Sequence, residues 1–363
     1  MTVKNNRFIF AAAGTGKTTQ IVSQALSIPE KEILMTTYTI ENTNNIIDEI
    51  IRKNGYIPPN ITILSWFSFL LTDLIRPYQT FLYDKERISE MVFSNKISNL
   101  YTNKTDVDKY YFRRNSSAIY SDKMSAFAYE CNKIGDNASV KRLAKRYHYI
   151  FIDETQDLSG WDLEVMEDIL NSDINVVMVG DSRQTTYKTH QTRKNLAYVD
   201  IYTWFEYLVK RNLGKLVVMD KSYRCKQEIC DLADSLYPNL PKTTSLNSDT
   251  VEHCGLFYIA TSDLATYYQK YKKPLILVYD RTSHSKAGGL PTINFGKAKG
   301  LTTHRSIIIP NGPIAKFLKT GEHSHIAKSI DKFYVAITRA KYSVAFVTDD
   351  TVVLPLVTKY SIF

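Results

Sequence analysis

Short apolar runs recur along the chain, and each one ends in a polar or glycine-containing turn. Eight of them predict buried strands: FIFAAA (8–13), ILMTTYT (33–39), YHYIFIDE (147–154), INVVMVGD (174–181), KLVVMD (215–220), PLILVYD (274–280), RSIIIP (305–310) and SVAFVTD (343–349). Helical patterns lie between them, among them GTGKTTQIVSQAL, IENTNNIIDEIIRK and KQEICDLADSLY. Apolar strands that alternate with helices are typical of parallel sheets in α/β proteins.

The alternation stops in residues 71–140, which are rich in aromatic and basic side chains but show few strand signals. This stretch predicts a small, mainly helical insertion. A chain of 363 residues is long enough for about two domains. We therefore expect an α/β fold in which residues 1–70 and 141–215 form the first domain, 71–140 the insertion and 216–363 the second domain.

The segment FAAAGTGKTTQ (10–20) has the composition of a phosphate-binding loop, because it follows a predicted strand and opens a predicted helix. Backbone N–H groups in such a loop surround phosphate oxygens at a helix N-terminus. The residues expected to bind the nucleotide are Ala13, Gly14, Thr15, Gly16, Lys17, Thr18 and Thr19. Lys17 would place its charge on the β- and γ-phosphates, and the Thr18 hydroxyl would bind Mg²⁺. The loop thus predicts ATP and Mg²⁺ as cofactors.

Two further strand ends carry polar groups that suit hydrolysis. In YIFIDETQD, Asp153 is expected to hold Mg²⁺ through water, and Glu154 to activate the attacking water. In VVMVGDSRQTTY, the Gln184 amide can both donate and accept hydrogen bonds, which suits a group that senses the γ-phosphate or positions water.

The net charge of the chain indicates what kind of partner it binds. The sequence has 46 Lys and Arg against 37 Asp and Glu, for a formal net charge of +9, which fits a protein that binds nucleic acid. No apolar run approaches the ~18 residues that span a bilayer, and the amino terminus has no signal-peptide pattern. We therefore expect a cytoplasmic protein without a membrane partner.

Six segments occur in the order in which UvrD/Rep-like superfamily 1 helicases carry their motifs: AAAGTGKT, DETQD, GDSRQTTY, KSYRC, AKGLT and YVAITRAK. The chain resembles that family over residues 11–341, and YVAITRAK is the most specific segment. The resemblance implies two RecA-like P-loop NTPase domains with ATP hydrolysed between them. It also implies movement along single-stranded DNA with 3′–5′ direction.

The resemblance also implies roles for single residues. In the second domain, Tyr223 would stack on adenine, Arg224 would reach the γ-phosphate and Arg339 would act as an arginine finger, with Gly300 of AKGLT as a further nucleotide contact. The nucleic-acid contacts implied are Tyr38 in TTYTIEN, Ser65 and Trp66 in LSWFSFLL, and Tyr187 after Gln184. The aromatic residues of LSWFSFLL fit a hydrophobic core equally well.

The chain departs from the family in size. Only 75 positions separate Arg224 from Lys299, an interval in which typical members place a large accessory domain. Two functions therefore stay open. The first is an ATP-dependent single-stranded DNA translocase or helicase. The second is a nucleic-acid-sensing ATPase subunit that switches a protein partner, such as a nuclease or a replication or repair factor.

Overall fold

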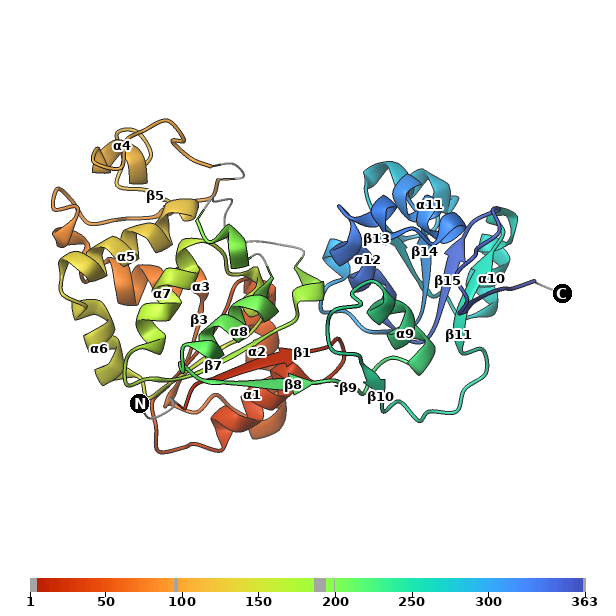
Figure 1. The fold of residues 1–363 in the computed structure, drawn as a ribbon, viewed down its shortest axis with the longest axis horizontal. Helices are drawn as coiled ribbons and strands as arrows, with labels where there is room; N and C mark the ends of the chain where they lie inside the picture. Colours follow the sequence, from red (N-terminus) through yellow and green to blue (C-terminus); the bar gives the residue numbers. More distant parts are fainter. Residues whose placement is uncertain (1–4, 95–96, 186–193, 199, 362–363) are drawn as a thin grey trace. The chain divides into compact units, whose positions relative to one another are not determined.

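The computed structural model describes residues 5–94, 97–185, 194–198 and 200–361 (Figure 1). The chain divides into two compact units. The first consists of residues 1–10, 17–182 and 187–217, and the second of residues 11–16, 183–186 and 218–363. Each unit contains one six-stranded sheet.

The first sheet has the strand order β3-β2-β6-β7-β1-β8. The neighbouring pairs β1–β7, β6–β7, β2–β6 and β2–β3 are all parallel. Its strands are β1 (Arg7–Ala11), β2 (Ile33–Thr37), β3 (Ile61–Ser65), β6 (Tyr149–Ile152), β7 (Asn175–Gly180) and β8 (Lys215–Met219). Because the paired strands are parallel, their carboxyl ends meet at one edge of the sheet.

The longer helices of the first unit are α1 (Lys17–Leu26), α2 (Ile40–Asn54), α5 (Met124–Ile134), α6 (Ala138–Arg146), α7 (Trp161–Leu170) and α8 (Ile201–Lys210). The shorter ones are α3 (Trp66–Phe69), η1 (Leu70–Ile75), η2 (Gln79–Phe81), α4 (Val107–Tyr111), η3 (Ser121–Lys123), η4 (Thr155–Asp157) and η6 (Leu196–Tyr198), while η5 (Ser182–Gln184) has one residue in the first unit and two in the second. Local signals define α2: the Thr39 hydroxyl accepts the Asn42 N–H at its start, and Gly55 ends it with φ +85°.

The stretch expected to be a helical insertion contains η2, α4, η3 and α5, and also one short parallel pair, β4 (Met91–Val92) with β5 (Ile119–Tyr120). In Figure 1, α4 and β5 lie in a small lobe beyond α5. Two-residue strands carry too few apolar positions to be read from the sequence.

The second unit has the strand order β13-β12-β14-β15-β11-β16, with every neighbouring pair parallel. Its strands are β11 (Gly255–Ile259), β12 (Leu275–Val278), β13 (Thr292–Asn294), β14 (Thr303–Ile309), β15 (Ala340–Val347) and β16 (Val357–Lys359), with β9 (Lys221–Ser222) and β10 (Thr244–Ser245) as a separate pair. Its helices are α9 (Gln227–Ser235), η7 (Thr261–Asp263), α10 (Leu264–Lys270), η8 (Arg281–Ala287), η9 (Gly296–Ala298), α11 (Gly312–Thr320), η10 (His323–Ile326) and α12 (Ile330–Ile337).

The α/β class predicted from the sequence is confirmed, since both sheets are parallel and alternate with helices. All eight predicted strands are present. The sequence did not reveal β3, β11, β13 and β16. Three of these, β3, β13 and β16, are edge strands of their sheets, where polar positions interrupt the apolar pattern. None of the helices among the described residues is both long and apolar enough to cross a bilayer.

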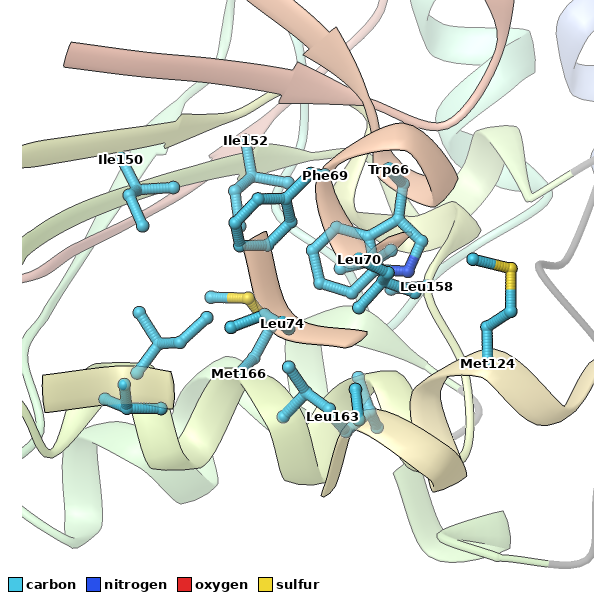
Figure 2. Close-up of a cluster of buried hydrophobic side chains, with 14 of the residues drawn as sticks. Trp66, Phe69, Leu70, Leu74, Met124, Ile150, Ile152, Leu158, Leu163 and Met166 are labelled. Atoms are coloured by element: carbon cyan, nitrogen blue, oxygen red, sulfur yellow. The ribbon is translucent and has the colours of Figure 1, made fainter. Parts of the chain in front are cut away.

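The core of the first unit joins strands β6 and β7 to helices α3, α5 and α7. Figure 2 shows part of it, with Ile150 and Ile152 from β6 facing Met166 and Leu163 of α7. Trp66 and Phe69 of α3 belong to the same cluster (Figure 2). This packing fixes the position of the segment between β6 and α7, which carries the acidic motif.

His253, in the loop before β11, stacks on two aromatic rings of the second unit. The His253 ring lies 4.1 Å from the Phe257 ring and 4.0 Å from the Tyr271 ring, nearly parallel to both. Its Nε2 is 2.6 Å from the Tyr267 hydroxyl. Burial, together with the positive charges of Arg305 and Lys270, lowers the pKa of His253 to about 4. The folded state therefore strongly favours the neutral imidazole.

This lowered pKa predicts a loss of stability in mild acid. The unfolded chain binds a proton at His253 below pH ~6.5, whereas the folded chain does so only near its own pKa of about 4. The free energy of unfolding should therefore fall as the pH drops from ~6.5 to ~4, by on the order of 2 kcal/mol from this residue. Urea titrations at pH 7, 5.5 and 4.5 measure the loss.

The variant His253→Phe keeps the stacking and removes the titrating group, so its unfolding energy should decline less over the same range. The control is His304→Phe, at an exposed position in β14, which should decline like the wild type. Equal slopes for the wild type and His253→Phe would contradict this prediction.

Candidate active site

The acidic motif and the start of α1 meet at one edge of the first sheet. Asp153 and Glu154 directly follow β6, and Lys17 is the first residue of α1, which follows β1 through the glycine-containing loop. β7 lies between β1 and β6 and is parallel to both. The carboxyl ends of the three strands therefore bring these residues together, as open α/β sheets do at their ligand sites.

Side-chain contacts join the four predicted residues directly. The Thr18 hydroxyl donates to Asp153 Oδ2 at 2.6 Å. The Lys17 ammonium lies 3.2 Å from Glu154 Oε1 and 3.3 Å from Glu154 Oε2. Asp153 and Glu154 are buried, with 3% and 8% of their surface exposed. Two carboxylates, one ammonium and one hydroxyl thus lie together, largely shielded from water. These four groups, from Lys17, Thr18, Asp153 and Glu154, form one corner of the unit.

Burial has a clear electrostatic consequence at Asp153. Desolvation and the negative charge of Glu154 raise the pKa of Asp153 to about 6, against the opposing effects of Lys17 and the Thr18 hydrogen bond. A carboxyl group with this pKa releases its proton readily when a cation approaches. The site therefore favours an added positive charge beside Asp153.

The donor set at this corner fits Mg²⁺. Hydroxyl and carboxylate oxygens are the ligands that Mg²⁺ prefers, and this ion usually takes only one or two of them from the protein and the rest from water and phosphate. The Thr18–Asp153 pair supplies that number. Within the described ranges, no three or more His, Cys, Asp or Glu residues lie close enough together to hold a metal ion.

Gln156 holds Glu154 in place, a role that the sequence did not reveal. Its amide nitrogen donates to the Glu154 carboxylate, and its Oε1 accepts the backbone N–H of Asp181 at 3.0 Å. A Cβ at Gly180 would lie only 2.7 Å from that oxygen, so the close approach requires glycine. Glu154 itself has φ +54°, a backbone conformation unusual for Glu. The Gln of the DETQD motif is the feature of the sequence that could have pointed to this role.

The predicted phosphate-binding loop, residues 11–16, groups with the second unit. Gly14 and Gly16 have φ +76° and +77°, which explains why both positions are glycine. Thr15 closes the turn, with its hydroxyl donating to the Ala12 carbonyl at 2.9 Å. Ala13 is buried, and Thr19 is exposed on α1.

Predicted nucleotide contacts in the second unit differ in exposure. The Tyr223 ring is 66% exposed, and its N–H donates to the Gly14 carbonyl at 2.9 Å. The Arg224 guanidinium donates to the Thr338 carbonyl at 3.2 Å. Gly300 has φ +88° between η9 and β14. Gln184, in η5, is buried.

Arg339 is 1% exposed and bonded to the backbone around it. Its Nε donates to the Val335 carbonyl at 2.8 Å, and one terminal nitrogen donates to the Leu301 carbonyl at 3.2 Å. These bonds tie α12 to the loop before β14. In this structure the side chain therefore stabilises the second unit, and the arginine-finger role stays a prediction.

The predicted nucleic-acid residues lie after β2 and β3. Tyr38 follows β2 and is half-buried, with its ring edge-on to Phe67 at 5.6 Å. Ser65 ends β3, and its hydroxyl accepts the Ser68 N–H at 3.3 Å to cap α3. Phe93, from the insertion, is 69% exposed and lies 5.8 Å from Phe67. No motif pointed to Phe93.

Trp66 is placed differently from the expectation. Its side chain is fully buried, and Figure 2 shows the ring beside Leu70 and Leu158 in the core cluster. Its indole N–H donates to Asp162 Oδ1 at 2.8 Å. The core alternative for LSWFSFLL therefore applies to Trp66, because a buried ring has no face to offer a base. Tyr187 lies outside the described residues.

A family comparison agrees with the motif order. Residues 82–195 match the model of the UvrD/REP helicase N-terminal domain. The chain is related to the UvrD/Rep-like helicases. The matched range contains Asp153, Glu154 and Gln184, whereas Lys17 and Arg339 lie outside it.

Two curated relatives of this chain come from streptococci. A protein of Streptococcus agalactiae serotype Ia, named as a subunit of an ATP-dependent helicase/nuclease, is 28% identical over 106 residues, which are 29% of this chain and 8% of the relative. The protein of the same name from Streptococcus suis is 27% identical over 135 residues, which are 34% of this chain and 11% of the relative. The matched part thus spans about a tenth of the relatives' length.

Two solved structures align with most of this chain. The arterivirus nonstructural protein 10 helicase aligns over 94% of this chain and 59% of its own, with 13% identity and a TM-score of 0.47. The complex of that helicase with DNA aligns over 95% and 60%, with 14% identity and a TM-score of 0.48.

Proposed function

We propose that this chain is an ATP-dependent motor that moves along single-stranded nucleic acid, with DNA as the preferred strand. The observation that carries the proposal is the corner where Lys17 and Thr18 contact Glu154 and Asp153. A cation, a hydroxyl and two carboxylates in contact are the groups that hydrolysis of a nucleoside triphosphate requires. The 3′–5′ direction rests on the family resemblance alone.

Each group at the corner has a chemical task in this proposal. Lys17 would bind the β- and γ-phosphates, Thr18 would hold Mg²⁺ directly and Asp153 would hold it through water, and the ion would neutralise phosphate charge. Glu154 accepts a proton from the attacking water, and Gln156 keeps its carboxylate oriented through the amide hydrogen bond. Arg224, Arg339, Gln184, Tyr223 and Gly300 are proposed nucleotide contacts on the strength of the resemblance.

The direct test is the ATPase rate of the purified chain with and without single-stranded DNA, duplex DNA and RNA. The proposal expects the rate to rise with single-stranded DNA and the rise to depend on Mg²⁺. A rate that no nucleic acid changes would overturn the proposal.

A second function is favoured by the name of the curated relatives, which are subunits of a helicase/nuclease. In that alternative, ATP hydrolysis on nucleic acid switches a partner nuclease, and the chain separates no strands by itself. A strand-displacement assay on the isolated chain distinguishes the two. Unwinding favours the motor, whereas stimulated ATPase without unwinding favours the switch.

Tyr38 is the aromatic side chain proposed to stack on a base. Tyr38→Ala should weaken binding of an oligo-dT strand by about 5-fold to 150-fold, since stacking contributes ~1–3 kcal/mol per base. Fluorescence anisotropy with a labelled oligonucleotide measures the dissociation constant. Tyr56→Ala removes a tyrosine that is 63% exposed in the loop after α2, and should leave that constant unchanged. Equal effects of the two substitutions would speak against stacking at Tyr38.

A further inference from the structure

Asp162 is a fully buried carboxylate near the start of α7. A buried carboxylate is costly to keep unless several donors satisfy it. Here the donors come from three separate parts of the first unit, which makes Asp162 a junction between them.

The contacts of Asp162 are specific. Its Oδ2 accepts the backbone N–H of Ser159 at 3.0 Å, and its own N–H donates to the Ser159 carbonyl at 3.1 Å. Its Oδ1 accepts the Trp66 indole N–H at 2.8 Å and also the Ser125 hydroxyl. One side chain thus joins the loop before α7 to α3 and α5.

On one side, Asp162 connects through Trp66 to the proposed nucleic-acid face, which consists of Tyr38 and Ser65. Trp66 directly follows Ser65, and Phe67 lies against Tyr38. Because the Trp66 ring is held in the core, a shift of the turn at Ser65 has to move the indole and its bond to Asp162 (Figure 2). Close-packed cores pass such shifts on, because they deform little.

On its other side, Asp162 connects through Ser159 to Glu154 of the candidate active site. Ser159 lies two residues after η4 (Thr155–Asp157), which begins directly after Glu154. Gln156, in the middle of η4, bonds to Glu154 at one end and to the Asp181 N–H at the other. The short helix is therefore held on one side by Asp162, through Ser159, and on the other side by Gln156.

We propose that Asp162 is a positioning residue that couples occupancy of the nucleic-acid face to the placement of Glu154. Binding at Tyr38 and Ser65 moves α3, the Trp66–Asp162 bond passes the movement to the Ser159 loop, and η4 then sets the Glu154 carboxylate. This inference rests on the proposed function, since it assigns a route by which nucleic acid accelerates ATP hydrolysis.

The test is Asp162→Asn in the full chain. The Trp66, Ser125 and Ser159 groups that face the carboxylate all donate to it, and an amide offers only one acceptor atom, so at least one contact becomes a donor–donor clash. The ATPase rate without nucleic acid should stay close to that of the wild type. The acceleration by saturating oligo-dT should fall by at least about 5-fold, the lower end of measured couplings between sites. Oligo-dT affinity is measured in parallel.

Two further variants sharpen this test. Asp168→Asn changes the same charge on the same helix, at a residue that pairs with Lys133 near the surface, and should keep the wild-type acceleration. Trp66→Phe removes the indole donor, together with one ring of the buried side chain, and should lower the acceleration as Asp162→Asn does. The double variant Asp162→Asn/Trp66→Phe should lose no more than the stronger single variant, because both break one link. If Asp162→Asn fails to fold, Trp66→Phe carries the test.

The outcomes separate this inference from the function itself. A wild-type chain that no nucleic acid accelerates overturns the proposed function and the coupling with it. A wild-type chain that is accelerated, with variants accelerated equally, overturns the coupling alone. A parallel loss of basal and accelerated rates would also overturn it, since that loss means a purely structural role for Asp162.

Discussion

Glu154→Gln is expected to lower kcat for ATP hydrolysis by about 10²–10⁴-fold, the usual contribution of a general base, while ATP stays bound. The carboxylate that would take the proton is replaced by an amide that cannot. The amide oxygen can still accept the Gln156 hydrogen bond, so the geometry of the corner should survive.

Electrostatics predicts how nucleotide binding responds to this change. The charge of Glu154 is one cause of the raised pKa of Asp153, so its removal should lower that pKa. Asp153 is then ionised over a wider pH range, and Mg²⁺–ATP should bind as tightly as in the wild type or more tightly. Single-turnover hydrolysis and titration with a fluorescent ATP analogue measure the two effects separately.

Glu90→Gln is the matched control, because Glu90 pairs with Arg113 at the surface and both side chains are more than half exposed. It should leave both kcat and ATP affinity unchanged. If Glu154→Gln hydrolysed ATP at the wild-type rate, the general base would have to be sought elsewhere.

Lys17→Ala is expected to reduce hydrolysis by at least about 10²–10³-fold, the typical cost of removing one group that stabilises transition-state charge. Unlike Glu154→Gln, it should also weaken ATP binding, because the cation meant for the phosphates is gone. Loss of the ammonium leaves Glu154 and Asp153 without its compensating charge.

The same loss predicts a pH effect in this variant. The charge of Lys17 lowers the pKa of Asp153, so removing it should raise that pKa above its value of about 6. Asp153 then stays protonated to higher pH, and Mg²⁺ competes with that proton. Mg²⁺–ATP binding by Lys17→Ala should therefore improve more between pH 6 and pH 8 than binding by the wild type.

Titrations of Mg²⁺–ATP at the two pH values check this, with Lys31→Ala as the control at an exposed position after α1. A Lys17→Ala variant with wild-type ATP affinity and turnover would remove Lys17 from the proposed mechanism.

Much of the fold was accessible from the sequence because its main strands are buried on both faces. Such strands carry continuous Val, Ile and Phe runs, as in YIFI of β6 and SVAFV of β15. The short pair β4–β5 and strand β13 lack this pattern, so their existence depends on neighbours distant in the chain. The two-residue strand β5, for example, pairs with β4, and its Ile119 also bridges Phe112.

The candidate site divides in a similar way. Residue types and motif order identified Lys17, Thr18, Asp153 and Glu154, since the chemistry of phosphate binding demands those groups at strand ends. The roles of Arg224, Arg339, Gln184 and Gly300 stay predictions. Trp66 and Ser65 belong to the same motif, and the sequence predicted both as nucleic-acid contacts. The packing of α3 against α7 buries Trp66 and leaves Ser65 partly exposed.

The sequence by itself determined the α/β class, the acidic strand end and the relation to UvrD/Rep-like helicases, and it predicted the phosphate-binding loop, because local residue patterns encode all of these. Only the tertiary structure decided that Gln156 holds Glu154 and that Asp162 joins Trp66, Ser125 and Ser159. Trp66 and Asp162 are 96 positions apart, and no spacing rule connects residues so distant in the chain. Their contact exists because the core brings α3 and α7 together, and burial then requires every polar group there to find a partner.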